Sequence, residues 1–360
     1  MMPAQQASSN DVRLALARKI RPANPSLAIV IPVFNESETV SLFMDRMQAV
    51  ETSLQAVGCQ LRYIFINDGS RDDTLEKLIN IQCEKSNVFV MDLSRNFGKE
   101  AALTAGIAEA VNQQVDLVVP IDVDLQDPPE LIVDMLAKWR QGYQLVLARR
   151  IDRSTDGLLK AWSALVFYRF FNTMSRQKLP ENVGDFRLMD RQVAEAIGHL
   201  NERSRMMKAL MNWVGFSRTF VDFHRASRSA GASTFNARSL FSLGISGFLA
   251  FSTAPLRAIL IIGILIAVIA FFYGAYIALK TLVQGVDVAG YASTLVIILV
   301  SLALQLITLG IVGEYVARLI EEVKARPNYL IAQKINASTA HDLQMRQPEG
   351  NKKTKNKGKS

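Results

Sequence analysis

Short apolar runs alternate with longer amphipathic stretches from residue 27 to residue 148. The apolar runs predict five strands, at residues 27–33, 61–67, 87–93, 115–121 and 144–148. The stretches between them predict four helices, at residues 38–57, 72–85, 99–112 and 129–140. The strand candidates are apolar almost throughout, as expected when both faces of a sheet are buried. Strands alternating with helices therefore predict a parallel sheet with helices on both faces.

The second half of the chain has a different pattern. Residues 258–279 and 291–313 are uncharged and apolar, and each span is roughly 22 residues long, which matches the thickness of a bilayer's hydrocarbon core. Residues 158–174 and 235–251 are amphipathic and predict helices at a membrane surface, although the first fits a core helix equally well. Arg and Lys flank the two spans on their outer sides, so the positive-inside rule predicts that both termini are cytoplasmic.

This pattern predicts six parts of the chain. They are a mobile N-terminal segment (1–25), a catalytic α/β domain (26–232), an interfacial amphipathic segment (233–256), a two-helix transmembrane domain (257–314), a juxtamembrane helix or segment (315–335) and a disordered basic tail (336–360). The formal net charge of +8 comes partly from lysines in the tail. Such a run is typical of a solvated disordered chain, with attraction to anionic lipid as the alternative. No nucleic-acid partner is expected.

Cysteine and histidine limit the chemistry. Cys59 and Cys83 are the two cysteines, too few for a disulfide framework and suited to a reducing cytosol. The three histidines are scattered, and no Cys/His spacing indicates zinc. Any bound metal ion is therefore expected to have oxygen ligands.

Polar clusters follow three of the predicted strands. Residues 32–36 end the first strand, residues 67–70 the second and residues 122–126 the fourth. Catalytic groups of an open parallel sheet lie beyond the carboxyl ends of its strands, so a strand order of 3-2-1-4 brings the clusters into one crevice. Each cluster alone fits an ordinary turn or helix cap. Their occurrence at three successive strand ends predicts a ligand site.

The chemistry of these clusters suits a sugar nucleotide. Neither GxGxxG nor GxxxxGK[ST] occurs, so a cation has to meet the charge of the diphosphate. Asp124 and Gln126 supply hard oxygen ligands suited to Mg²⁺ or Mn²⁺, which acts as a Lewis acid on a leaving diphosphate. Asp68 is a candidate acceptor of hydrogen bonds from the base or ribose, and the backbone of residues 32–35 a candidate edge for the base.

The motifs that carry these residues resemble a known family. They read PVFNE, NDGSRDDT, LSRNFGKEAALTAGI, DVDLQDPPE and GDFRLMDR. Together they are similar to family 2 glycosyltransferases with the GT-A fold, a Rossmann-like α/β fold with a mostly parallel sheet. The resemblance is strongest to the dolichyl-phosphate mannose synthase branch and to its bacterial bactoprenyl glucosyltransferase type, and it covers residues 27–332.

The resemblance implies roles for individual residues. Asp122 and Asp124 match the Asp-x-Asp motif that holds the divalent metal ion and the diphosphate, and Gln126 matches a further metal ligand. Asp185 matches an acidic catalytic residue near the acceptor and the donor sugar. The nucleotide pocket matches Pro32, Val33, Asn35, Glu36, Asp68, Asp122 and Val123. A phosphate-binding segment matches Arg225, Arg228, Gly231 and Ser233, but Thr234 stands where relatives usually carry Lys, which puts a phosphate contact there in doubt.

Basic residues after the fifth strand suggest where an acceptor binds. Arg150, Arg153 and Lys160 are candidates to clamp the phosphate of a polyprenyl phosphate, with a positive surface beside anionic lipid as an equal alternative. A phosphate is already ionised at neutral pH, so Asp185 is expected to orient groups rather than take a proton. Residues 95–99 are interpreted as structural support for the crevice.

The sequence thus predicts a bacterial plasma-membrane enzyme that transfers one hexose, with inversion, from a nucleotide sugar to polyprenyl (undecaprenyl) phosphate for modification of cell-envelope glycans. UDP is the expected nucleotide, the catalytic domain is expected to be cytosolic, and the identity of the sugar is open. One alternative is a processive polysaccharide synthase, although the QxxRW motif of that class does not occur. Another is an inactive scaffold or flippase partner. Small residues such as Gly263 and Gly274 allow the spans to pack in a homo-oligomer.

Overall fold

The computed structural model describes most of the predicted α/β domain and two stretches of the later apolar part. The described residues are 14, 21–151, 183–200, 202, 207–224, most of 263–283, and 290–336. The chain divides into two compact units. The first comprises residues 1–164, 179–233 and 327–360, and the second comprises residues 165–178 and 234–326.

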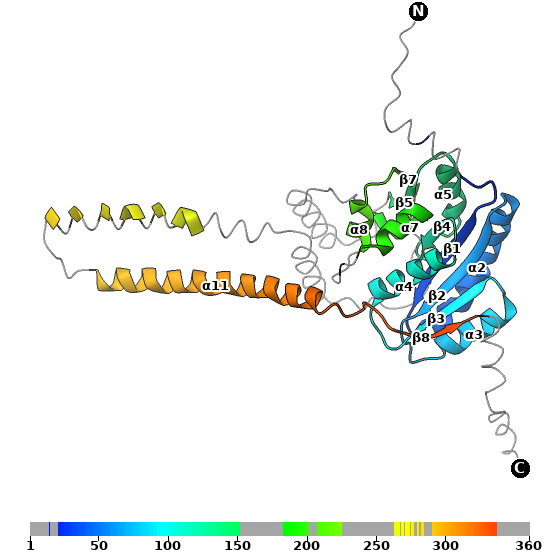
Figure 1. Ribbon diagram of the computed structural model, residues 1–360, viewed down its shortest axis with the longest axis horizontal. Helices are drawn as coiled ribbons and strands as arrows, with labels where there is room; N and C mark the ends of the chain where they lie inside the picture. Colours follow the sequence, from blue (N-terminus) through cyan, green and yellow to red (C-terminus); the bar gives the residue numbers. More distant parts are fainter. Residues whose placement is uncertain are drawn as a thin grey trace, which may run out of the picture. The chain divides into compact units, whose positions relative to one another are not determined.

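The first unit is built on an eight-stranded sheet with the order β7-β5-β6-β4-β1-β2-β3-β8 (Figure 1). The strands are β1 (Ser26–Val33), β2 (Gln60–Asn67), β3 (Val88–Leu93), β4 (Leu117–Pro120), β5 (Leu145–Arg150), β6 (Val183–Asp190), β7 (Arg218–Phe223) and β8 (Ile331–Ile335). Strand β1 pairs in parallel with β2 and β4, and β2 pairs in parallel with β3. The central order β3-β2-β1-β4 is the predicted one, so a mostly parallel sheet is confirmed.

Helices cover both faces of this sheet. They are α2 (Ser37–Ala56), α3 (Thr74–Glu84), α4 (Lys99–Asn112), α5 (Leu131–Arg140), α7 (Arg191–Gly198) and α8 (Met207–Trp213). Residues of α2, α3 and α5 share one apolar cluster with the sheet, and residues of α4, α7 and α8 share the other. Within β1, Ile29 faces the first cluster and Val30 the second, which explains the unbroken apolar run.

Three strands were not among those predicted. Strand β6 lies between β4 and β5 and is antiparallel to both, so β5 does not extend the parallel series. Strand β7 pairs in parallel with β5, and β8 pairs antiparallel with β3. The run of β6 is broken by Asp185 and Arg187, and that of β8 by Gln333 and Lys334. Charged and polar side chains at these positions hide both strands from a search for apolar runs.

Both ends of the catalytic domain differ from the prediction. Arg21, placed in a mobile segment of residues 1–25, donates to the Tyr143 carbonyl at 2.9 Å and stacks over the Trp139 ring at 4.4 Å. Residues 331–335, placed in the juxtamembrane segment of residues 315–335, form β8 in the catalytic sheet. The domain therefore includes chain from outside both of its predicted boundaries, through contacts that a local pattern does not encode.

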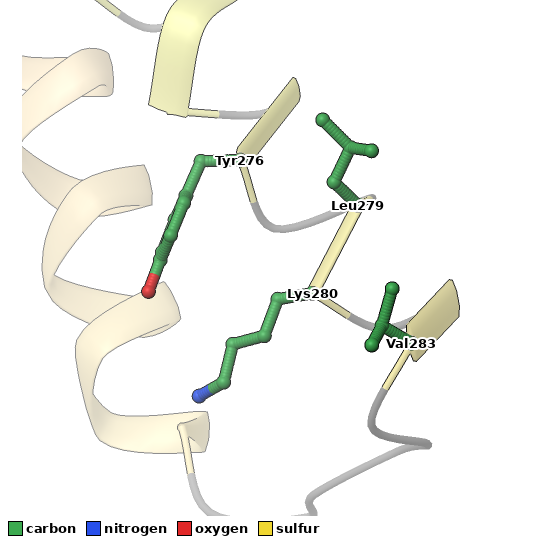
Figure 2. A pocket seen from close by; sticks show the side chains of 4 residues that line it. All are labelled: Tyr276, Leu279, Lys280 and Val283. Atoms are coloured by element: carbon green, nitrogen blue, oxygen red, sulfur yellow. The ribbon is translucent and has the colours of Figure 1, made fainter.

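The described part of the second unit is helical. Helix α11 (Tyr291–Val323) contains the whole of the apolar span predicted at residues 291–313. Described residues in and just after the other span, between 263 and 283, are helical, and Tyr276, Leu279, Lys280 and Val283 among them line a pocket of about 270 Å³ (Figure 2). Among the helices that the structure describes, none combines the length and apolar character that crossing a membrane requires. The two membrane spans remain predictions, and the predicted interfacial helices lie outside the described residues.

Close packing of α4 on the sheet depends on a glycine. A Cβ atom on Gly106 would lie 2.3 Å from Val30 Cγ1 and 2.5 Å from Ile66 Cδ1. Ala101, Ala102 and Ala105 on the same helix are also buried. Small residues thus allow α4 to approach the sheet closely.

Replacing Gly106 by Val is expected to lower the free energy of unfolding by about 1–3 kcal/mol, because the stiff side chain of Val30 cannot make room for extra methyl groups. Urea denaturation of the purified protein measures this. Gly198→Val is the matched control, since nothing lies within 4 Å of the Cβ position at Gly198. Equal destabilisation of the two variants would contradict the packing argument.

The two cysteines are expected to differ in reactivity. Cys59 is 1% exposed, and burial raises the pKa of its thiol to about 11, whereas Cys83 is exposed. Since the thiolate is the reactive form, a thiol reagent should label Cys83 in the native protein and Cys59 only after unfolding. Mass spectrometry of the labelled chain locates the modification, and Cys83→Ser should remove native labelling. Rapid labelling of Cys59 in the folded protein would contradict its burial.

Candidate functional site

The three predicted clusters meet at the carboxyl ends of β1, β2 and β4. The Asp68 amide donates to the Val33 carbonyl at 2.9 Å, and the Ile121 amide donates to the Val30 carbonyl at 3.0 Å. These bonds carry the strand pairing into the loops that follow. The crevice expected from the strand order therefore has its polar residues side by side.

The first two loops hold each other. The Asn35 amide donates to Ser70 Oγ at 3.0 Å, and Asn35 Oδ1 accepts from the Arg71 amide at 2.8 Å. Asn35 has a φ of 54°, a left-handed conformation that Asn tolerates better than most residues. The Glu36 amide donates to Thr74 Oγ1 at 2.9 Å. Asn35 and Glu36 thus fix the loop geometry, and their roles in nucleotide binding, with those of Pro32 and Val33, stay predictions.

Asp68 clamps the loop that precedes α4. Its side chain is buried, Oδ1 accepts from the Phe97 amide at 2.7 Å and Oδ2 accepts from the Gly98 amide at 2.9 Å. Burial raises the pKa of Asp68 against the opposing effect of these two amides and of Arg95. Both carboxylate oxygens accept hydrogen bonds from backbone amides just before α4, so the carboxylate fixes where α4 begins. Its predicted contact with base or ribose stays a prediction.

The Asp-x-Asp turn separates its apolar side chains from its polar ones. Val123 and Leu125 join the apolar core, whereas Asp122, Asp124 and Gln126 are half-exposed. The Gln126 amide donates to Asp124 Oδ1 at 3.1 Å, and Leu125 has a φ of 58°. The turn thus keeps two carboxylates and one side-chain amide outside the apolar core. Val123, predicted in the nucleotide pocket, is 3% exposed, so at most its backbone faces a ligand.

Strand β6 brings Asp185 to this turn. It pairs antiparallel with β4, Leu117 with Asp190 and Val118 with Met189, so the first residues of β6, among them Asp185, lie toward the carboxyl end of β4. Lys99 lies between the two carboxylates, with Nζ 2.7 Å from Asp122 Oδ2 and 3.0 Å from Asp185 Oδ2. Burial lowers the pKa of Lys99, but the two carboxylates outweigh it, and the pKa is raised. The ammonium is therefore held in its charged form.

Arg187 supports Asp185 from behind. It is 3% exposed, its Nε donates to the Asp185 carbonyl at 3.2 Å, and its Nη2 donates to the Gly184 carbonyl. Burial lowers the pKa of Arg187, against the attraction of Asp185 and Glu100. Glu100 in turn accepts from the Met207 amide at 3.0 Å, at the start of α8. Charges of alternating sign therefore run from Asp122 through Lys99, Asp185 and Arg187 to Glu100.

Three members of this chain of charges, Lys99, Glu100 and Arg187, were not among the predicted site residues. Lys99 was interpreted as structural support, and Arg187 had no role. One local signal was present, because Lys99 is the first residue of α4, and the positive end of a helix dipole disfavours a cation there. A lysine in that position indicates acidic groups nearby.

The chemistry of its side-chain oxygens decides whether this turn suits a divalent metal ion. Among the described residues, no three His, Cys, Asp or Glu side chains converge on one point as a preformed metal site. Asp122, Asp124 and Gln126 nevertheless provide three hard oxygen donors within one turn, the type that Mg²⁺ and Mn²⁺ prefer. The residues fit such an ion, and the carboxylate of Asp122 is shared with Lys99.

The predicted acceptor-binding residues are described only in part. Arg150 ends β5 and is half-buried. The others lie outside the described residues: Arg153, Lys160, Arg225, Arg228, Gly231 and Ser233. Their roles stay predictions.

Replacing Asp68 by Asn is expected to lower the free energy of unfolding by about 1–3 kcal/mol, because an NH₂ group would then face the Phe97 or Gly98 amide and leave it unsatisfied. Thermal and urea unfolding measure this. Asp45→Asn, on the exposed side of α2, is the matched control and should change stability by less than about 0.5 kcal/mol. A neutral effect of Asp68→Asn would mean that the clamp contributes nothing to folding.

The chain is similar to known proteins over most of its length. The model of the family "Glycosyl transferase family 2" matches residues 28–198. An uncharacterized glycosyltransferase of Synechocystis is 44% identical over 306 residues, which cover 85% of this chain and 94% of that protein. A prophage-derived bactoprenol glucosyl transferase of Shigella flexneri is 45% identical over 306 residues, covering 85% of this chain and 97% of that protein. An uncharacterized glycosyltransferase of Bacillus subtilis is 36% identical, covering 84% and 92%.

Proposed function

The chain belongs to glycosyl transferase family 2 and is a glycosyltransferase, and from this premise we propose that it transfers one hexose from a nucleotide sugar to a polyprenyl phosphate. The observation that carries the proposal is the convergence of Asp122 and Asp185 on the Lys99 ammonium, from the end of β4 and from β6. A relative 45% identical over nearly its full length is named a bactoprenol glucosyl transferase, which supports this acceptor class and makes glucose the first sugar to test.

The donor is proposed to be a UDP-sugar. Asp122, Asp124 and Gln126 would hold Mg²⁺ or Mn²⁺, and the bound ion supplies Lewis-acid stabilisation of the departing diphosphate. The loops joined by Asn35 and Ser70 are the proposed edge of the base and ribose pocket, since they lie at the carboxyl ends of β1 and β2. Their mutual hydrogen bonds fix that edge before the donor arrives.

The acceptor phosphate is the proposed nucleophile. One of its oxygens forms a bond to the anomeric carbon as the bond from that carbon to the nucleotide diphosphate breaks, and attack from the opposite face inverts the configuration. Because the phosphate is already ionised, no strong general base is needed. Asp185, held by the buried Arg187, is proposed to orient the sugar and the acceptor rather than to take a proton.

A polyprenyl acceptor places the reaction at a bilayer. We propose that residues 258–279 and 291–313 anchor the chain in a bacterial plasma membrane with the catalytic domain and both termini in the cytoplasm. Large exposed apolar side chains along α11 support this: Ile297, Ile298, Leu302, Ile307, Leu309 and Val312. The anchor would hold the catalytic domain near the phosphate head of the lipid.

Replacing Asp124 by Asn is expected to reduce formation of the lipid-linked sugar by about 10²–10³-fold, the effect typical of removing one group that stabilises charge in the transition state. Transfer of labelled glucose from UDP-glucose to undecaprenyl phosphate measures the rate, with other UDP-hexoses as further donors.

Asp134→Asn on α5 is the matched control, because Asp134 is exposed and ten residues beyond Asp124 in the same segment of chain. It should keep the wild-type rate. If Asp124→Asn folds normally and also keeps that rate, the metal-binding role assigned to the Asp-x-Asp turn is wrong.

A further inference from the structure

Lys99 and a divalent metal ion would compete for the same carboxylate, that of Asp122. Its ammonium lies 2.7 Å from Asp122 Oδ2, and Asp122 is one of the three oxygen-bearing residues of the proposed metal site. A lysine ammonium is a compact point charge on a flexible stem. The Lys99 side chain is 43% exposed, so it has room to withdraw. One carboxylate thus faces two potential cations, one of them permanently attached to the chain.

The local structure explains why a cation is needed between Asp122 and Asp185 when no metal ion is bound. Asp122 Oδ2 and Asp185 Oδ2 both lie within 3.0 Å of the Lys99 ammonium, and two like charges held this close to each other repel. The Lys99 ammonium touches both carboxylates and cancels part of that repulsion. Its place at the start of α4 is unfavourable on its own, since the helix dipole is positive there. The two carboxylates compensate for this cost.

We propose that Lys99 is a positioning residue that acts as a tethered counter-cation, holding Asp122 and Asp185 in the donor-free site and releasing Asp122 when the metal ion and the nucleotide diphosphate bind. This inference rests on the metal site of the proposed function. The metal ion alone must displace an ammonium from one of its ligands and therefore binds weakly. With the diphosphate present, the released ammonium gains a new anionic partner. Binding of the nucleotide diphosphate therefore increases the affinity for the metal ion, and binding of the metal ion increases the affinity for the nucleotide.

The test is a direct measurement of Mn²⁺ affinity in the purified full-length protein, without donor and with UDP, by electron paramagnetic resonance of free Mn²⁺. Lys99→Met is expected to bind Mn²⁺ about tenfold more tightly than wild type without nucleotide, because one positive charge near the site is gone. UDP should improve Mn²⁺ binding in the wild type and improve it less in Lys99→Met. Lys99→Gln should behave like Lys99→Met, and it keeps the experiment decisive if the methionine variant does not fold.

Two controls separate this effect from a general loss of structure. Lys99→Arg retains the charge and should bind Mn²⁺ like wild type. Lys334→Met removes a lysine that pairs with Glu109 at 2.5 Å in the same unit, and it should leave Mn²⁺ affinity unchanged. A lysine needed only for folding would weaken the site when removed, so a gain in affinity identifies the proposed role.

Each contrary result has its own meaning. If wild type binds Mn²⁺ and loses it in Asp124→Asn, but Lys99→Met and Lys99→Gln bind it no more tightly than wild type, the counter-cation role is wrong and the metal site stands. If neither wild type nor the Lys99 variants bind Mn²⁺ with or without UDP, the metal site fails and the inference fails with it.

Discussion

Repulsion between two facing carboxylates is the constraint around which the site is built. Inserting β6 antiparallel beside β4 brings Asp185 to the turn that follows β4, where the Lys99 ammonium contacts both Asp122 and Asp185. Such a pair needs positive charge close by, and α4 supplies it by starting with Lys99. The position of the helix is therefore tied to the electrostatics of the crevice. Any change in the start of α4 alters the balance between the acidic groups.

Three contacts with the backbone or within the core keep α4 and Asp185 in position. Asp68 accepts from two backbone amides immediately before the helix, and Gly106 lets the middle of the helix approach β1 and β2. Arg187 fixes the backbone around Asp185 from the buried side. These groups need touch no substrate. They hold charged side chains to within the small tolerances that transfer chemistry requires, which is the usual task of residues behind an active site.

Sequence patterns could predict the centre of the fold because local and global preferences agree there. The strands from β1 to β4 are apolar on both faces, and the helices between them keep a regular period. The alternation of these strands and helices along the chain could therefore be predicted. Strands β6 and β8 were missed because Asp185, Arg187 and Lys334 interrupt their apolar runs for reasons of tertiary structure. In the site, the Asp-x-Asp turn could be located by its place after a strand. The role of Lys99 could not, because it depends on a strand insertion that no spacing in the sequence reveals.

The late return of the chain to the sheet has a consequence for biosynthesis. Strand β8 covers the outer edge of β3, and the Ser94 amide donates to the Leu330 carbonyl beside the loop that leads to Lys99. Residues 331–335 leave the ribosome after the α11 sequence. Until then β3 is an open edge, with unpaired amides and carbonyls that invite pairing with other chains. Nascent chains of this protein should therefore depend on chaperone protection until translation has passed β8.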